Sequence, residues 1–294
     1  MMDNNIKIVK GGGVDELPDN FGYRINTKVK TLVIPKGLPK PTSTAVMFDS
    51  CRSLSDLDLT NLDCSLVTDM SQMFKDCESL GYGNFSFPSN FNSSKVTDMS
   101  GMFYQCIFLT TLDLTNLNTS SVTNMSSMFY RCNRLTSLTY GPNFDTSKVT
   151  NMSDMFAGIG LPTIDLSQFN TSSLTNMYEM FSSSHLTSLT IPTNFNTSKV
   201  THMGSLFLYA SNLTALDLAN IDTSSVTQMF SMFEGCSSLT ELDLTSFNFD
   251  KVTSFSNMLD MGGTCTVYVK SEADKTLLTN NANPSSGVTI VVKS

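Results

Sequence analysis

The sequence predicts a repeat solenoid that is leucine-rich-repeat-like. It would have about eight coils of about 26 residues, with short parallel strands on one face, short helical or 3₁₀ turns opposite, and a cap at each end. Three observations predict it. The phrase Val-Thr-x-Met-Ser-x-Met-Phe-x-x-Cys recurs every 25 to 29 residues, a Leu-x-Leu alternation precedes it in many units, and the two ends of the chain depart from the repeat. The phrase begins at Val67, Val96, Val122, Val149, Leu174, Val200, Val226 and Val252.

Residues 1–45 are predicted to be an N-terminal cap or an attachment segment. They contain two strand-like pieces, 6–9 and 31–34, separated by three consecutive glycines and a turn with proline, and they close in a proline-rich stretch. Seven basic and four acidic side chains give this segment a net charge of +3. Both interpretations, cap and attachment segment, stay open. An attachment segment implies an assembly partner for residues 1–45.

Residues 46–261 are predicted to form the solenoid, and each coil is expected to begin with a short strand. Alternation at period two turns the Leu residues toward the core and the residue between them toward solvent. Asp at this central position tends to alternate with Ser or Thr, which keeps most carboxylates about 10 Å apart because neighbouring strands lie about 4.8 Å apart. The central residues are Asp58, Ser86, Asp113, Thr139, Asp165, Thr190, Asp217 and Asp243.

The Ser-x-Met-Phe-x-x-Cys piece is predicted to be one or two turns of helix or 3₁₀ helix, with its serine as an N-cap. Its Met and Phe columns are expected to fill the core. The Cys position also accepts Ile, Ser and Ala, which indicates a small buried side chain rather than a disulfide framework or a zinc site. The cysteines at this position are Cys51, Cys77, Cys106, Cys132 and Cys236.

Two columns of hydroxyl side chains repeat with the coils. A threonine is the second residue of every phrase, from Thr68 to Thr253, and a serine column runs from Ser65 to Ser224. We expect both columns to hydrogen-bond to turn backbone or to the equivalent residue one coil away. Residues 262–294 are predicted to be a C-terminal cap, with strands at 266–269 and 288–292 and a helix at 271–280 that together cover the last sheet edge.

The candidate binding face consists of the central aspartates and of lysines in the turns of the proline-containing coils. Two interpretations of the Asp stripe are open: solubility of a solvent-facing sheet, or recognition of a cationic or polyhydroxylated partner. Calcium could be shared only by Asp217 and Asp243, which would be direct neighbours, because carboxylates 10 Å apart cannot hold one ion. The candidate residues are Asp58, Asp113, Asp165, Asp217, Asp243, Lys95, Lys148 and Lys199.

Several kinds of function are disfavoured. Residues 46–261 carry eight basic and twenty acidic side chains, a net charge of −12 that repels phosphate backbones and argues against nucleic acid. No apolar run is long enough to insert into a membrane, and the N-terminal residues lack the apolar stretch of a secretory signal peptide, so we expect neither. The sequence has no nucleophile elbow, phosphate loop or HExxH motif, and His185 and His202 are interpreted as surface substitutions. We therefore expect no catalytic residues, metal or cofactor.

The template L-T-x-L-D-L-T-x-F-x-T-S-x-V-T-x-M-S-x-M-F-x-x-C resembles the repeat of the BspA-type leucine-rich-repeat surface proteins of bacteria over residues 46–261. This resemblance implies a leucine-rich-repeat-like solenoid with a non-catalytic adhesion or binding role on an outward-facing surface.

These observations lead to three hypotheses. The first is a binding or adhesion protein that displays a rigid repeat face to a protein or glycan ligand on a cell or host surface. The alternative is a virion structural protein of a phage, a fibre or decoration protein, docked through residues 1–45. Either would place the protein on an exterior surface. An intracellular scaffold is a third hypothesis, consistent with free cysteines.

Overall fold

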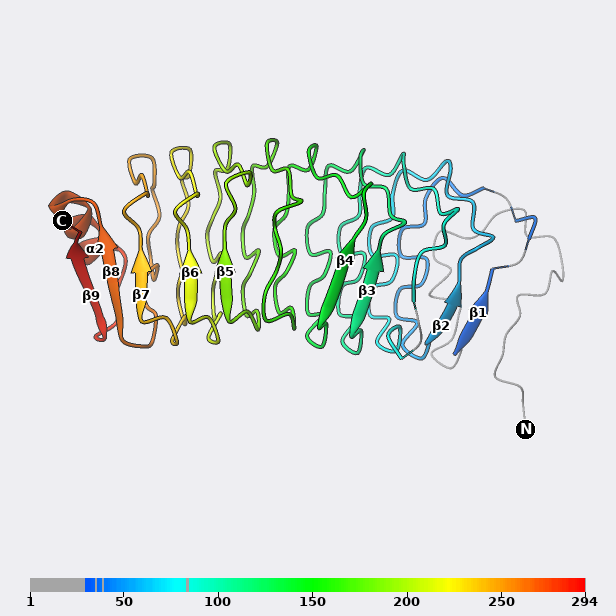
Figure 1. The fold of residues 1–294 in the computed structure, drawn as a ribbon, viewed down its shortest axis with the longest axis horizontal. Coiled ribbons are helices and arrows are strands. Elements are labelled where there is room, and N and C mark those ends of the chain that lie inside the picture. The colour runs from blue at the N-terminus through cyan, green and yellow to red at the C-terminus, as the bar shows by residue number, and fades with distance from the viewer. Residues whose placement is uncertain (1–29, 35, 39, 83–84, 294) are drawn as a thin grey trace. The chain divides into compact units, whose positions relative to one another are not determined.

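The structure is a computed structural model that describes residues 30–293 except 35, 39, 83 and 84, and the chain divides into two compact units, residues 1–146 and 147–294 (Figure 1). Each unit is a parallel β-solenoid in which successive coils stack on one another. The described residues make about ten turns with a repeat of about 25 residues. The predicted solenoid is confirmed, with more turns than the eight expected.

In the first unit, parallel strands from successive coils pair in register. Leu32 lies opposite Leu57, and Leu112 lies opposite Leu138, so apolar residues stack on apolar residues along the core. An isolated bridge between Ser86 and Asp113 continues the ladder between these pairs. The paired strands are β1 (Thr31–Val33) with β2 (Asp56–Asp58), and β3 (Thr111–Leu114) with β4 (Ser137–Tyr140).

The ladder begins on the N-terminal side of residue 46, where we predicted the solenoid to start. β1 lies within the segment predicted as a cap or attachment segment, yet it pairs with β2 as later strands pair with their neighbours. The amide of Val46 donates to the carbonyl of Ser71 at 2.9 Å. The segment of this coil that lies opposite its strand therefore also stacks on the next coil. Residues 1–29, including the predicted strand 6–9, lie outside the described residues, and their role as cap or docking segment stays a prediction.

The second unit ends in a strand, a helix and a strand, as predicted for residues 262–294. The helix begins after Ser271, whose hydroxyl accepts a hydrogen bond from the amide of Asp274, which is the N-cap arrangement. The elements of this unit are β5 (Ser188–Thr190) paired with β6 (Ala215–Asp217), β7 (Glu241–Asp243) paired with β8 (Cys265–Val269), α2 (Glu272–Asn281), and β9 (Val288–Val292) paired with β8.

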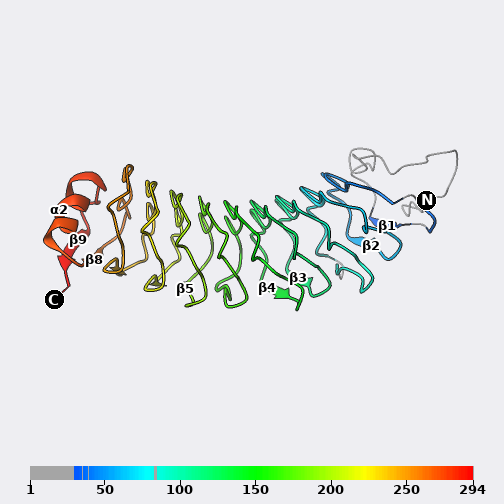
Figure 2. The same cartoon turned by 90° about the horizontal axis from the view of Figure 1, so that it is seen from above.

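The leg opposite the strands consists of tight turns rather than the predicted helical segments (Figure 2). Two residues of each such turn in the first unit adopt positive φ, for example Gln72 and Asp76 at 55° each. A left-handed residue every few positions reverses the chain and stops an α-helix from propagating. Ser71 is therefore no helix N-cap: its own amide donates to Asp69 Oδ1 at 2.8 Å.

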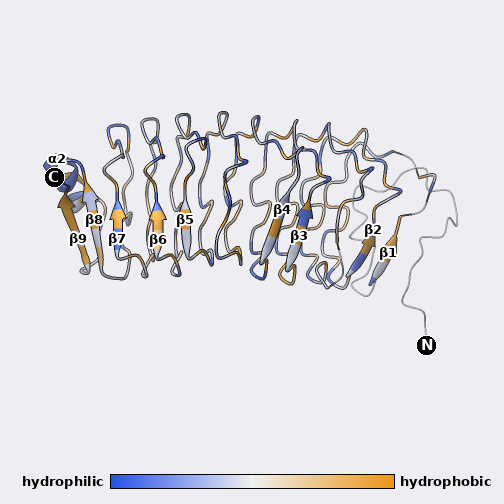
Figure 3. Cartoon of the chain, in the orientation of Figure 1, coloured by the Kyte–Doolittle hydropathy of each residue, from blue (hydrophilic) through white to orange (hydrophobic). Residues whose placement is uncertain are grey.

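The core of each unit is a column of stacked phenylalanine rings, as the Met and Phe pattern predicted. Ring centroids of successive coils lie 5.4 to 6.0 Å apart in the first unit and 5.6 to 5.9 Å apart in the second, with nearly parallel planes. Figure 3 shows hydrophobic and hydrophilic residues alternating along the coils that surround them. The two columns are Phe48, Phe74, Phe103, Phe129 and Phe156, Phe181, Phe207, Phe233.

The hydroxyl and thiol columns join coil to coil. Thr97 Oγ1 donates to the carbonyl of Thr68 at 3.1 Å, and later threonines repeat this contact, as predicted. None of the seven cysteines forms a disulfide, and all are buried, including Cys64 and Cys265. The thiol of Cys77 donates to the carbonyl of Phe48 at 3.0 Å, so in this coil the buried side chain of the slot also joins two coils.

Candidate functional site

The predicted aspartates lie on the strand leg of each unit, and hydroxyl residues occupy the central position in the coils beside Asp113 and between Asp165 and Asp217. Asp113 lies between Ser86 and Thr139 in the first unit, and Asp217 pairs with Thr190 in the second, as the alternation predicted. Asp58, Asp113, Asp165 and Asp217 are exposed and Asp243 is half-buried. Each unit therefore presents its own polar strand face.

Each of these aspartates also has a structural task that the sequence interpretation missed. Its Oδ1 accepts the backbone amide two residues later, an Asx turn that redirects the chain at the end of the strand. One carboxylate oxygen is therefore committed to the turn. The acceptor–donor pairs are Asp58 with Thr60 at 2.8 Å, Asp113 with Thr115 at 2.8 Å, Asp165 with Ser167 at 2.8 Å, Asp217 with Ala219 at 3.0 Å, and Asp243 with Thr245 at 2.9 Å.

At Asp58 and Asp165 these turn contacts favour the ionised carboxylate. The hydroxyl and amide of Thr60 hold the pKa of Asp58 below its usual value, and the amide and hydroxyl of Ser167 do the same for the pKa of Asp165. A hydrogen bond to the charged form favours that form. Asp58 and Asp165 therefore carry negative charge at neutral pH.

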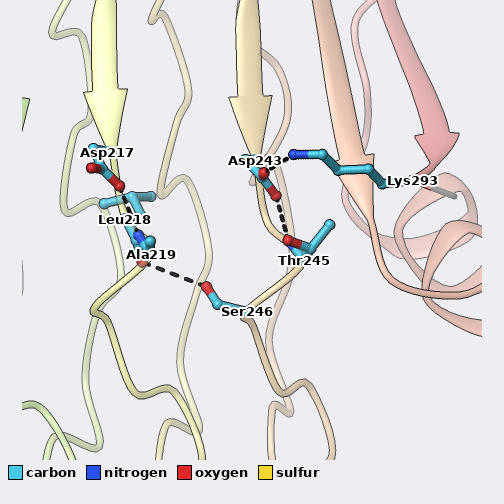
Figure 4. Close-up of polar contacts among 7 residues, drawn as sticks. All are labelled: Asp217, Leu218, Ala219, Asp243, Thr245, Ser246 and Lys293. Carbon is cyan, nitrogen blue, oxygen red and sulfur yellow. Dashed lines mark hydrogen bonds and ion pairs between the residues drawn. The ribbon is translucent and has the colours of Figure 1, made fainter.

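Asp217 and Asp243, the pair considered for calcium, belong to neighbouring coils, but their strands β6 and β7 are not paired in one sheet (Figure 4). Asp243 Oδ2 instead lies 2.6 Å from Nζ of Lys293, just beyond β9. Desolvation raises the pKa of Asp243, but the hydrogen bonds from Lys293 and Thr245 outweigh it and the pKa lies below its usual value. Among the described residues, no group of three or more His, Cys, Asp or Glu side chains is arranged to hold a metal ion.

The predicted lysines are exposed but lie away from the strand aspartates. Lys95, Lys148 and Lys199 occupy turns that directly precede a buried valine at the start of the second leg. Within the described part of the chain, the ion pairs are Lys40–Asp63, Arg52–Glu78 and Lys293–Asp243, so the three lysines do not pair with the Asp columns. Lys251 occupies the same repeat position and extends the series, which the sequence interpretation missed.

The first unit exposes an aromatic and cationic surface that the sequence interpretation also missed. The rings of Tyr104 and Tyr130 stack with centroids 4.5 Å apart, Lys75 Nζ lies 5.8 Å from the Tyr104 centroid, and the Arg131 guanidinium lies 5.4 Å from the Tyr130 centroid. Such cation–π contacts are attractive. The available signal was the variable residue after the conserved Phe, which is Lys75, Tyr104 and Tyr130 in successive coils.

His202 is more than the predicted surface substitution. Its Nδ1 accepts the amide of Gly204 at 3.3 Å, the place that Asp or Asn fills in other coils. Its ring packs edge-on against Tyr178 at 5.0 Å and against Phe230 at 5.8 Å. Burial lowers the pKa of His202, so the ring is neutral when it makes these contacts. His185, by contrast, is exposed, as predicted.

A carboxyl pair lies on the turn leg of the second unit. Asp154 has positive φ, and desolvation, the nearby charge of Glu179 and a hydrogen bond with it raise the pKa of Asp154 to about 6. The nearby charge of Glu179 disfavours ionisation of Asp154, so the Asp154 carboxyl holds a proton at mildly acidic pH.

Asp165 differs from the other candidate aspartates because it borders a depression. The segment around it belongs to no described strand, and the surface between this segment and β5 is hollowed by about 340 Å³. Thr163, Ser167, Ser188 and Thr190 contribute polar groups to its lining. This is the candidate residue that the structure places beside a concave surface.

The comparisons with known proteins add no activity. The family model described as "Mycoplasma protein of unknown function, DUF285" matches residues 42–158, 113–190 and 185–267. No curated protein matches the chain. One similar solved structure is a leucine-rich repeat protein from Bacteroides ovatus, with 15% identity, a TM-score of 0.39, and coverage of 91% of this chain and 84% of that chain. Within the described residues, no helix is long and apolar enough to cross a membrane.

Proposed function

The chain belongs to the family described as Mycoplasma protein of unknown function, DUF285, and from that premise we propose that it is a non-catalytic binding or adhesion protein. Its strand faces would meet a protein or glycan ligand on a cell or host surface, and the protein would act on an exterior surface. The partner would be neither nucleic acid nor a membrane interior, since the repeat body is acidic and its apolar side chains fill the core.

The observation that carries this proposal is the fixed register of the exposed aspartates. Asx turns orient each carboxylate, and backbone hydrogen bonds between coils set the spacing of the strands that carry them. A surface that is ordered before it binds loses little conformational entropy on binding. A rigid, regular and polar face therefore suits recognition of an extended or repetitive partner.

The proposal that the protein is non-catalytic rests on the burial and contacts of the cysteine thiols and of His202, the side chains considered as nucleophile or base. Burial raises the pKa of the Cys132 thiol to about 12, and the thiols of the other described cysteines are also buried with raised pKa values. A thiol acts as a nucleophile through its thiolate, which such sites disfavour. His202 already uses Nδ1 in its turn and packs against two aromatic rings.

A combined glycan and protein ligand array with the full chain tests this function. We expect specific capture by at least one ligand class, and we expect Asp→Asn substitution along the strand faces to weaken that capture about tenfold or more. Asn keeps the side-chain oxygen that closes each Asx turn, so the variant separates charge from fold. Failure of the chain to capture any ligand, or capture unaffected by the Asp→Asn set, would contradict the proposal for these faces.

A further inference from the structure

The strand ladder of the second unit opens locally between the segment 164–166 and β5. Ser188, Leu189 and Thr190 pair in register with β6 on one side, whereas no β-bridge joins them to residues 164–166 on the other. The depression of about 340 Å³ lies at this opening. In the first unit, by contrast, Thr139 of β4 pairs directly with Asp113 of β3.

Hydrogen bonds close the opening at both ends. On one side, the amide and the hydroxyl of Thr187 both donate to the carbonyl of Pro162, at 2.9 and 3.2 Å. On the other side, Asn194 Nδ2 donates to the carbonyl of Ser167 at 2.7 Å. The opening is therefore a bounded pocket in the sheet surface, too short for an extended chain to run through along the strand direction.

The pocket presents backbone groups as well as side chains. Alternate residues of a parallel strand direct their N–H and C=O groups to opposite neighbours. The amide of Ile191 donates to the carbonyl of Asp217 on the β6 side at 3.1 Å, so the amides and carbonyls of Ser188 and Thr190 point toward the opening. Hydroxyls of Ser188 and Thr190 lie beside them.

The remaining lining is a carboxylate and an apolar surface. Asp165 is exposed, and its pKa is held below the usual value by Ser167, so it stays ionised and accepts hydrogen bonds. Ile164, Leu189 and Pro192 supply carbon surface at the same place. A few placed polar groups beside an apolar surface form the usual pattern of a small-ligand site.

A sequence signal accompanies the opening. The corner between the Cys position and the next Leu contains two residues in other coils, such as Asn133-Arg134, but one residue in two successive coils, Gly160 and His185. These are the two coils that border the pocket. The shortened corners mark them as different from the rest of the repeat.

We propose that this pocket is a subsite for one neutral saccharide unit of a glycan. The inference rests on the proposed binding function and specifies its ligand class at Asp165. Sugar hydroxyls both donate and accept, which matches the amides, carbonyls and hydroxyls of Ser188 and Thr190 together with the Asp165 acceptor. The C–H face of a pyranose ring fits against Pro192 and the leucine surface.

Other ligand chemistries match this pocket less well. The Asp165 carboxylate repels sialylated, sulfated and uronic acid sugars. One carboxylate, with one oxygen already held by Ser167, is a poor cation site because hard cations take about six to eight oxygen ligands. An extended peptide that adds to β5 would have to displace the Thr187 and Asn194 contacts that close the pocket.

The test compares matched substitutions in the full chain, with the first unit as control. Thr190→Trp fills the pocket, and Thr139→Trp places the same side chain at the same repeat position where the ladder is closed. Asp165→Asn removes the charge and keeps the turn acceptor. Binding is measured by calorimetry and by NMR of the Ser188 and Thr190 amides, using the neutral oligosaccharides that score highest on a glycan array.

We expect neutral saccharides to shift the Ser188 and Thr190 amide signals. Thr190→Trp should weaken their binding about tenfold or more, whereas Thr139→Trp should leave it within about twofold. Glycan binding that Thr190→Trp leaves unchanged overturns the subsite but not the binding function. Binding of only anionic glycans or peptides at these residues would likewise overturn the subsite but not the binding function. Absence of any glycan or protein ligand on the array overturns both.

Discussion

The ammonium nitrogen of Lys293 lies 2.6 Å from Oδ2 of Asp243, although fifty positions separate the two residues in the chain. Nζ of Lys293 lies 5.4 Å from the ring centroid of Tyr268. Tyr268 belongs to β8, the strand between β7, which carries Asp243, and β9. This contact ties the end of the C-terminal strand–helix–strand segment to the last repeat coil. It also balances the charge of Asp243, whose neighbouring coil carries Asp217 at the equivalent position.

We expect Lys293→Met to lower the unfolding midpoint slightly, and less so in high salt, because both partners are about half exposed and the pair is screened. The contact depresses the pKa of Asp243, so its stabilisation is present above the unfolded-state pKa, about 3.9, and is lost as the pH falls through the lower folded-state value. Urea denaturation from pH 2 to 7 measures this. Lys293→Arg is the control, and a Lys293→Met effect that persists at pH 2 would argue against an ionic origin.

Asp154→Asn should stabilise the protein at neutral pH by about 1 kcal/mol, after allowance for partial exposure. The pKa of Asp154 is raised to about 6 by burial and Glu179, so the folded state resists ionisation and stability falls as the pH rises from about 4 through 6. The substitution should flatten that part of the pH profile. Asn also tolerates the positive φ of this residue. Glu179→Gln should lower the pKa of Asp154 in an NMR titration, and no change would show that the pair is not coupled.

The seven buried thiols should resist alkylation in the native state. Burial raises the pKa of Cys132 to about 12, and the Cys106 and Cys77 thiols donate to carbonyls one coil away. Iodoacetamide at pH 8 should modify the described cysteines only after unfolding, as mass spectrometry would show. Because the folded-state pKa exceeds the unfolded-state value of about 8.5, stability should decline as the pH rises above that value. Fast modification of native Cys132 would rule out the buried column.

Asn151→Ala should destabilise the second unit by about 1 kcal/mol, because it leaves the amide of Ser153 without its side-chain acceptor, 3.0 Å away in the wild type. Asn151→Asp keeps an acceptor at the same place and serves as the matched control. Chemical denaturation compares the two variants. Equal losses for Ala and Asp would mean that the Asx turn contributes nothing to stability.

Gly204→Ala should cost about 1–3 kcal/mol, because its Cβ would lie 2.8 Å from carbon atoms of the Phe230 ring. Phe230→Ser, which restores the residue found at this position in several coils, should relieve the clash. A double-mutant cycle by thermal denaturation would then give a strongly favourable coupling for the pair. Additive losses would place the cost of the alanine elsewhere.

Much of the architecture could be predicted because a solenoid is a sum of nearest-neighbour contacts. The period, the inward Leu residues and the Phe, Met and Cys columns follow from the repeat, since a side chain that stacks on its equivalent must suit every coil. The helical interpretation of the second leg was wrong for a local reason. Met and Phe recur at a spacing that a turn and a helix share. The residues that adopt positive φ are glycine in only some coils, such as Gly101, and are residues such as Gln72 and Asp76 in others, so the sequence does not mark them consistently.

The candidate site was predictable only in part. The alternation of Asp with Ser or Thr located the exposed strand faces. The backbone amides that donate to these carboxylates in the Asx turns can be identified only from the path of the backbone. The stacked pair Tyr104–Tyr130 occupies a variable slot that a consensus template discards. The ion pair of Lys293 with Asp243 joins a nonrepeating segment to a repeat coil, so the repeat pattern of the sequence does not predict it.

The sequence alone determined the fold class, the repeat length, the residues of the core and the strand–helix–strand ending, because each of these depends on local pattern and on contacts between like positions. Only the tertiary structure decided where the ladder stays closed and where it opens beside Asp165. The physical reason is that strand pairing depends on how two neighbouring coils fit together. The two coils that border this opening keep the hydrophobic pattern of the repeat and differ from the other coils by a corner that is one residue shorter.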